Sequence, residues 1–143
     1  MPLRSIVILL ATAFTTSVCA QTAQDEMKRL DGTWAFVSGY EKGRHAMASS
    51  NEKARAFRVI FRGSNVHFRP AEPPFQNYVI GVFPQMKPKA IDLRDSQGTA
   101  QGIYELSGDA LKLRIGNLGH PRPSSFALPP TENELILVLK RER

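Results

Sequence analysis

The chain is predicted to be an all-β protein, an antiparallel barrel of about eight strands that follows a short N-terminal helix. Short apolar segments recur along the chain, and most of them alternate with polar residues as strands with one buried face do. Ten Gly and ten Pro are scattered through 143 residues, which indicates short elements joined by turns. No helical periodicity extends beyond residue 56. A closed meander is therefore favoured, and a two-sheet sandwich is the alternative.

The elements are assigned in chain order. Acidic residues precede basic ones at 24–30, which suits a short helix and its dipole. The segment 49–52, Ser-Ser-Asn-Glu, resembles a capping box and predicts one helical turn ending at Ala56. Turn residues at 41–43, 63–64, 96–98 and 107–109 separate the strand candidates. The strands are expected at 33–40, 44–48, 57–62, 65–69, 78–83, 89–94, 101–106, 110–115 and 134–141.

Alternation assigns faces to three of these strands. In the segment 110–115, Lys112 and Arg114 are expected on the polar outer face, opposite three apolar residues. Arg58 and Arg62 take the same outer position in the segment 57–62. The side chains expected to point inward are Phe57, Val59, Phe61, Leu111, Leu113, Ile115, Leu135, Leu137 and Leu139.

Residues 1–20 have the features of a secretory signal peptide. Arg4 supplies a positive start, and the apolar segment 6–14 is too short to span a bilayer, which needs about 20 residues. Small side chains then precede a cleavage position after Ala20. We expect an exported protein, periplasmic or extracellular, without a transmembrane segment.

Residues 21–143 are expected to form one domain, since compact domains of this length are common. Cys19 is the only cysteine of the chain, so a disulfide within it is excluded. Cleavage removes Cys19 with the leader, unless a lipid is attached there, which is the alternative. Packing alone must then hold the fold.

The composition excludes several classes of protein. Hydrophobic residues make up 42% and charged residues 22% of the chain, which is not the composition of a disordered polymer. The formal net charge is +6, but Lys and Arg are dispersed along the sequence. Proteins that bind nucleic acid gather such charge on one face or carry a known module. We expect a solvated basic surface and no nucleic-acid partner.

One segment resembles a known motif. Residues 31–39, DGTWAFVSG, resemble the opening motif of lipocalins and other calycins. The stretch 86–113, the Arg122-Pro123-x-x-Phe126 motif and 137–141 together resemble an uncharacterised lipocalin-like domain family, known mainly from planctomycete and related bacteria. The resemblance implies a calycin-type antiparallel barrel in an exported protein. It implies no activity and no catalytic residues, and many members carry cysteine where this chain has Arg114.

The resemblance also implies a contact between Trp34 and Arg141. In lipocalins a basic residue from late in the barrel packs across the tryptophan of the first strand. Arg141 shares its expected face with the inward leucines of the last strand, so it can stack on the indole. We assign this pair a structural role in closing one end of the barrel.

The polar residues Asp92, Tyr104, Asp109 and Arg122 lie within or close to the longest motif. One interpretation places them around a mouth of the barrel, where they would anchor the polar part of a ligand. The favoured interpretation pairs Asp92 with Arg122, so that this ion pair pins the long loop 116–130. Asp109 is then explained as part of a hairpin turn.

No enzyme chemistry is indicated. His45, His67 and His120 lie on separate segments without a second ligand nearby, so no metal is expected. No nucleophile, base and orienting group occur in a known arrangement, and no phosphate-binding glycine loop is present. We expect a protein that is not an enzyme and needs no cofactor.

Two functional hypotheses remain. Most inward candidates are bulky, which favours a filled barrel acting as a binding or structural module. Its Pro-rich loops, 70–77 and 116–130, would contact an envelope macromolecule. The alternative is a small apolar or amphipathic molecule bound inside the barrel. Its candidate binding residues are Phe57, Phe61, Asp92, Tyr104 and Arg122.

Overall fold

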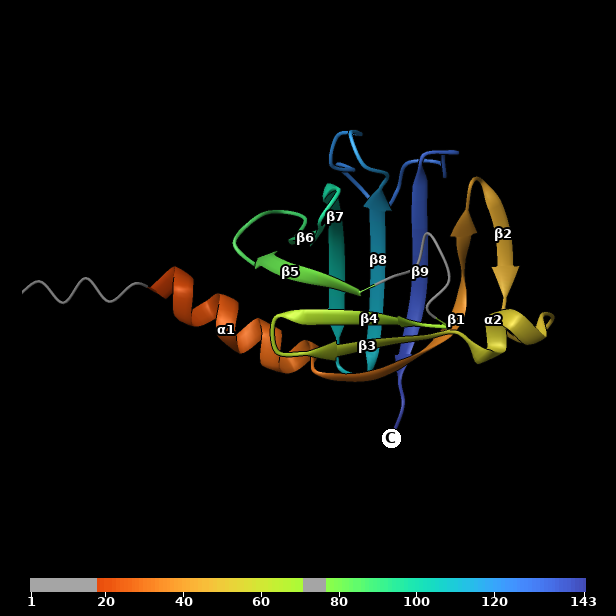
Figure 1. The fold of residues 1–143 in the computed structure, drawn as a ribbon, viewed down its shortest axis with the longest axis horizontal. Coiled ribbons are helices and arrows are strands. Elements are labelled where there is room, and N and C mark those ends of the chain that lie inside the picture. Colours follow the sequence, from red (N-terminus) through yellow and green to blue (C-terminus); the bar gives the residue numbers. More distant parts are fainter. Residues whose placement is uncertain (1–17, 71–76) are drawn as a thin grey trace, which may run out of the picture.

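The computed structural model describes residues 18–70 and 77–143 and shows an all-β fold with two short helices in these parts (Figure 1). Residues 1–17, which contain most of the expected signal peptide, lie outside the described residues, as does most of the expected 70–77 loop. The elements are α1 (Val18–Leu30), β1 (Gly32–Glu41), β2 (Arg44–Met47), α2 (Glu52–Ala56), β3 (Arg58–Arg62), β4 (Asn65–Arg69), β5 (Asn77–Phe83), β6 (Ala90–Asp95), β7 (Gly98–Ser107), β8 (Ala110–Gly116) and β9 (Glu134–Arg141).

Eight strands close the barrel. Each strand from β3 to β9 is antiparallel to the next, and β1 joins β3 on one side and β9 on the other. The predicted barrel is confirmed, and the sandwich alternative is wrong because the pairing of β1 with β9 leaves no second sheet. The strand β2 lies outside this ring. It pairs with the second half of β1, whereas β3 pairs with the first half.

The expected elements match the observed ones closely. The largest difference among the strands is at β7, which begins at Gly98 instead of residue 101. The reason is a tight hairpin, because Asp95 of β6 is already paired with Gly98. The helix expected at 24–30 is longer and begins at Val18. None of the helices in the described parts has the length and apolar content needed to cross a membrane.

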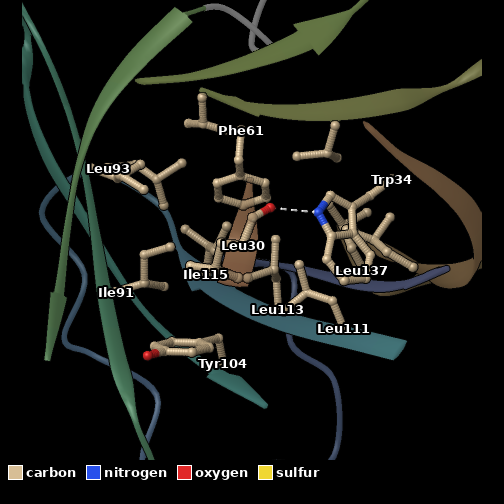
Figure 2. Packing of buried hydrophobic residues seen from close by; sticks show 14 of the residues in the cluster. Leu30, Trp34, Phe61, Ile91, Leu93, Tyr104, Leu111, Leu113, Ile115 and Leu137 are labelled. Carbon is tan, nitrogen blue, oxygen red and sulfur yellow. Dashed lines mark hydrogen bonds between the residues drawn. The ribbon is translucent and has the colours of Figure 1, made fainter. Parts of the chain in front are cut away.

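One end of the barrel is closed by the last turn of α1. Leu30 is fully buried there, and the Trp34 indole N–H donates a hydrogen bond to the Leu30 carbonyl at 2.8 Å. Figure 2 shows Phe61 and Tyr104 among the side chains packed around this pair. Figure 2 also labels the apolar residues that surround them: Ile91, Leu93, Leu111, Leu113, Ile115 and Leu137.

Arg141 contacts Trp34, as the resemblance to lipocalins implies. Its guanidinium is 4.3 Å from the centre of the Trp34 ring, in direct register across β1 and β9. The same group donates to the Asp31 and Arg29 carbonyl oxygens at 2.6 and 2.5 Å. It therefore ties the C-terminal end of α1 to the barrel as well as covering the indole.

Replacing Arg141 by Ala should lower the free energy of unfolding by about 1–2 kcal/mol, because a cation–π contact and the packing of the side-chain stem are lost. The intrinsic fluorescence of Trp34, the only tryptophan, should shift towards that of a hydrated indole. Urea unfolding followed by fluorescence measures both effects. A curve that superimposes on that of the wild type would show that the contact contributes nothing.

The outer face of β8 differs from the expectation. Arg114 was expected among solvent-exposed residues, but it is only 1% exposed. The β8–β9 loop (residues 117–133) folds back over it, and its guanidinium donates to the carbonyl oxygens of Ser125, Leu128 and Pro129. Glu134 accepts two further bonds from Arg114, at 2.5 and 2.9 Å. A loop that returns across the barrel wall thus buries an outward-pointing side chain.

A second arginine fixes the same loop. Arg122 donates to the Asp92 carboxylate at 2.6 Å, so the ion pair of the favoured interpretation is present. It also donates to the Ile91 and Gly102 carbonyl oxygens on β6 and β7. Asp92 and Arg122 consequently lie on the outer wall of the barrel, where they hold the β8–β9 loop.

Candidate functional site at the mouth of the barrel

The end of the barrel opposite α1 carries the larger of two hollows. Its volume is about 490 Å³, and it lies between β1, β9 and the segment formed by β2 and α2. Most of its wall is apolar. The apolar and aromatic residues that line it are Phe36, Tyr40, Ala46, Ala54, Ala56, Phe57, Pro70, Leu135, Ile136 and Leu137.

A smaller hollow of about 170 Å³ adjoins it at the mouth. The two hollows share Glu41 and Leu135 in their walls. The smaller one extends across β5, β6, β7 and the start of the β8–β9 loop. Its apolar and aromatic residues are Phe68, Tyr78, Leu93, Ala100, Ile115, Leu118 and Leu135.

A row of aromatic rings connects the two hollows. Phe36 and Phe57 meet edge to face with ring centres 6.0 Å apart, and Phe57 and Phe68 are also 6.0 Å apart. Phe68 then meets Tyr78 edge to face at 5.8 Å. Such geometry adds stabilisation to the burial of each ring. A continuous row of aromatic rings therefore contributes to the walls of both hollows.

Local sequence explains why the larger hollow exists. Lys42 and Gly43 have positive φ values of 51° and 76°, which the tight turn between β1 and β2 requires. The Asn51 side chain accepts hydrogen bonds from the Lys53 and Ala54 backbone N–H groups and so begins α2. The turn and the cap together place Ala54 over the mouth. Because Ala46 and Ala54 are small, space remains beneath them.

The charged residues of the mouth surround the smaller hollow. Three acidic residues, Glu41, Asp95 and Glu132, and one basic residue, Lys42, are among those that line it. Glu134 lines it too, but its carboxylate already bonds with Arg114. The hydrogen bond from Arg114 lowers the pKa of Glu134, which stays ionised. Acidic residues therefore outnumber basic ones in the described lining of the smaller hollow, on a chain whose formal net charge is +6.

The structure separates the candidate ligand-binding residues. Phe57 lines the larger hollow, whereas Phe61 is 1% exposed in the closed half and lines neither hollow. Tyr104 lies in the closed half as well, where burial and the neighbouring Glu26 carboxylate raise its pKa well above the usual range. Asp92 and Arg122 are on the outer wall. Only Phe57 of this set is at the mouth.

Sequence reasoning missed the residues that create space. Phe36, Phe68 and Tyr78 belong to the bulky aromatic set of the chain, and the sequence gives no sign that they meet at one end. The small residues Ala46 and Ala54 were assigned no role. Their position beneath a segment that stands away from the ring follows from the tertiary structure alone.

Within the described ranges, no three His, Cys, Asp or Glu side chains gather in a way that would hold a metal ion. His45 contacts the Tyr40 ring at 4.8 Å, and His67 bonds with Asn77, so each has a local partner. Comparison of the chain with protein-family models, with curated proteins and with solved structures finds no match in any of the three.

Proposed function

We propose that this chain is an exported, non-enzymatic barrel that binds one small, mainly apolar molecule at its mouth. The observation that carries the proposal is the hollow of about 490 Å³ with its apolar wall. Small-molecule sites in proteins are concave, mainly apolar and roughly 300–1,000 Å³ in volume. The hypothesis of a ligand in the barrel is therefore preferred to that of recognition by the loops alone.

The binding site is confined to the mouth. Phe61 and Trp34 are 1% and 0% exposed and belong to the packed cluster beneath α1. Neither of them lines a hollow. A bound molecule would therefore contact Phe36, Phe57 and Leu135 and stop above the closed half.

One observation favours the loop hypothesis as a second candidate. The β8–β9 loop is fixed to the wall by Arg114 and Arg122, yet Leu118 and Leu128 within it are 45% and 50% exposed. A rigid loop with exposed apolar side chains is suited to contact with another macromolecule. Such a role does not require the larger hollow to be occupied.

Binding of the neutral fluorophore N-phenyl-1-naphthylamine tests the first proposal. We expect saturable, one-to-one binding to the wild type with enhanced emission. Ala54→Trp should abolish it, because an indole on α2 fills the larger hollow that Ala54 lines. Ala110→Trp is the matched control, since Ala110 is exposed at the start of β8, at the closed end.

The control variant should bind the fluorophore as the wild type does. Equal binding by Ala54→Trp would place the fluorophore elsewhere and remove the support for a site at the mouth. Absence of binding to the wild type, up to the solubility limit of the fluorophore, would favour recognition by the loop.

A further inference from the structure

We propose that the molecule bound at the mouth is an amphipathic organic cation, an apolar body carrying an amine or quaternary ammonium group; this proposal rests on the proposed function. Its apolar body would occupy the larger hollow and its charged group the smaller one. Glu41 and Leu135 line both hollows, and a molecule that reached past these two residues would occupy both.

The larger hollow suits the apolar part. The charged residues of its described lining are Lys53 and Glu41, and Glu41 also lines the smaller hollow. Apart from Gly39 and Asn51, whose side chain caps α2, the other lining residues are aliphatic or aromatic, with Phe36 and Phe57 packed edge to face. An apolar chain or ring system that enters this hollow loses contact with water, which is favourable.

The smaller hollow suits a positive charge. Glu41, Asp95 and Glu132 line it, and none of them pairs with Lys or Arg in the part of the chain that the structure describes. Among the described lining residues, the basic side chain there is Lys42. Since Glu134 is neutralised by Arg114, the carboxylates outnumber the ammonium group.

Aromatic rings in the same wall favour an organic cation over a metal ion. Phe68 and Tyr78 line the smaller hollow together with these carboxylates. An ammonium group within about 6 Å of an aromatic ring is attracted by the ring quadrupole, and a methylated ammonium also buries its carbon atoms there. Carboxylates combined with aromatic rings therefore match the two parts of an alkylammonium group.

An anionic ligand such as a fatty acid is the alternative to an organic cation. The net charge of +6 would attract it at long range. Charges are screened over about 8–10 Å at physiological ionic strength, so the groups lining the hollow decide the preference of a bound molecule. A carboxylate end group in the smaller hollow would lie among residues of which three, Glu41, Asp95 and Glu132, are acidic and one, Lys42, is basic, so repulsion would outweigh attraction.

Three probes with the same tail and different end groups test the charge preference: decyltrimethylammonium, 1-decanol and decanoate. Titration calorimetry of the wild-type protein near neutral pH should give the tightest binding for the cation. We expect it to bind about tenfold more tightly than the anion, a difference that a few screened charges at short range can supply. The preference should shrink as salt concentration rises.

The outcomes separate this proposal from the one on which it rests. Saturable binding of all three probes with equal affinity, or tighter binding of decanoate, would overturn the cationic ligand and leave the apolar site intact. Absence of saturable binding by every probe would overturn both proposals.

A triple variant, Glu41→Gln, Asp95→Asn and Glu132→Gln, tests the assignment of the carboxylates. The Asp95 carboxylate accepts a hydrogen bond from the Gln97 backbone N–H, and asparagine retains that acceptor. We expect decyltrimethylammonium to lose at least about fivefold in affinity while 1-decanol is unaffected. Glu105→Gln is the matched control, because Glu105 is an exposed residue of β7 that lines neither hollow. It should change the affinity for neither decyltrimethylammonium nor 1-decanol. Unchanged cation affinity in the triple variant would overturn the proposal.

Discussion

Replacing Arg114 by Met should lower the free energy of unfolding by about 3–5 kcal/mol, the usual cost of removing one partner of a buried ion pair. The Arg114 side chain is 2% exposed and its Glu134 partner 11% exposed, so water does not replace the lost bonds without rearrangement. Methionine retains an apolar stem of similar shape. The effect therefore reports the guanidinium group.

In Arg114→Met, the Glu134 carboxylate and three backbone carbonyl oxygens all lose the hydrogen-bond donor that Arg114 supplies. They belong to Ser125, Leu128 and Pro129, all in the β8–β9 loop. Unpaired acceptors of this kind are costly when they stay buried. The loop should therefore detach from the wall in the variant, and limited proteolysis within residues 117–133 should become faster.

Urea unfolding of the variant and of two comparison proteins measures the effect. Lys112→Met removes an exposed cation from the same face of β8 and should change stability by less than about 0.5 kcal/mol. Arg114→Lys retains the charge but loses the planar fork, so it should lie between the wild type and Arg114→Met. If the urea midpoint of Arg114→Met equalled that of the wild type, Arg114 would not stabilise the fold by holding the β8–β9 loop.

The ion pair between Arg114 and Glu134 predicts that the free energy of unfolding depends on pH. The hydrogen bond from Arg114 holds the pKa of Glu134 below its ordinary value of 4.5. Because the pKa is lower in the folded state, the stabilisation is complete above the unfolded pKa and disappears as pH falls through the folded pKa. Glu134→Gln should be less stable than the wild type near pH 7, and the gap should narrow once the pH falls below the ordinary carboxyl value.

The sequence predicts the barrel well because alternation is a local property. The inward positions of Leu111, Leu113 and Leu137 follow from a period of two, and all three are buried. Arg114 also faces outward as the period of two requires, but it is buried where exposure is expected. Alternation decides which side of the sheet a residue faces, but only a distant loop decides whether that side is covered.

One signal pointed to Arg114. Its partner across β8 and β9 is Ile136, so Glu134 lies diagonally opposite on the same face. Opposite charges at diagonal positions of neighbouring strands are within reach of long side chains. The ion pair is thus predictable once the register is known, whereas its burial is not.

The mouth illustrates a second limit of sequence reasoning. The bulk of the aromatic residues suggests a filled barrel, and the closed half around Trp34 and Phe61 is packed in this way. At the other end, β2 lies outside the ring, and Ala54 of α2 lines the hollow at the mouth. Volume there depends on how two segments are spaced, which the sequence pattern does not specify.

Phe61→Ala should lower the free energy of unfolding more than Phe57→Ala does, although the two residues share one face of the chain. Phe61 is 1% exposed in the packed half, so its removal should cost about 3–5 kcal/mol of unfolding free energy. Phe57 is half-buried and lines the larger hollow, so the cavity term is smaller and the cost should be less than about half of that.

Binding of N-phenyl-1-naphthylamine should respond in the opposite order. Phe57→Ala changes the wall of the hollow, and its affinity for the fluorophore should change severalfold. Phe61→Ala lies below the site, so the fraction that remains folded should bind as the wild type does. Both quantities are measured on each variant, with urea unfolding for stability and a fluorescence titration without urea for affinity.

If Phe61→Ala altered the affinity and Phe57→Ala did not, the ligand would extend into the closed half and the site at the mouth would be wrongly placed. If both variants lost stability equally and neither changed the affinity, Phe57 would be an ordinary core residue and the larger hollow would have no part in binding.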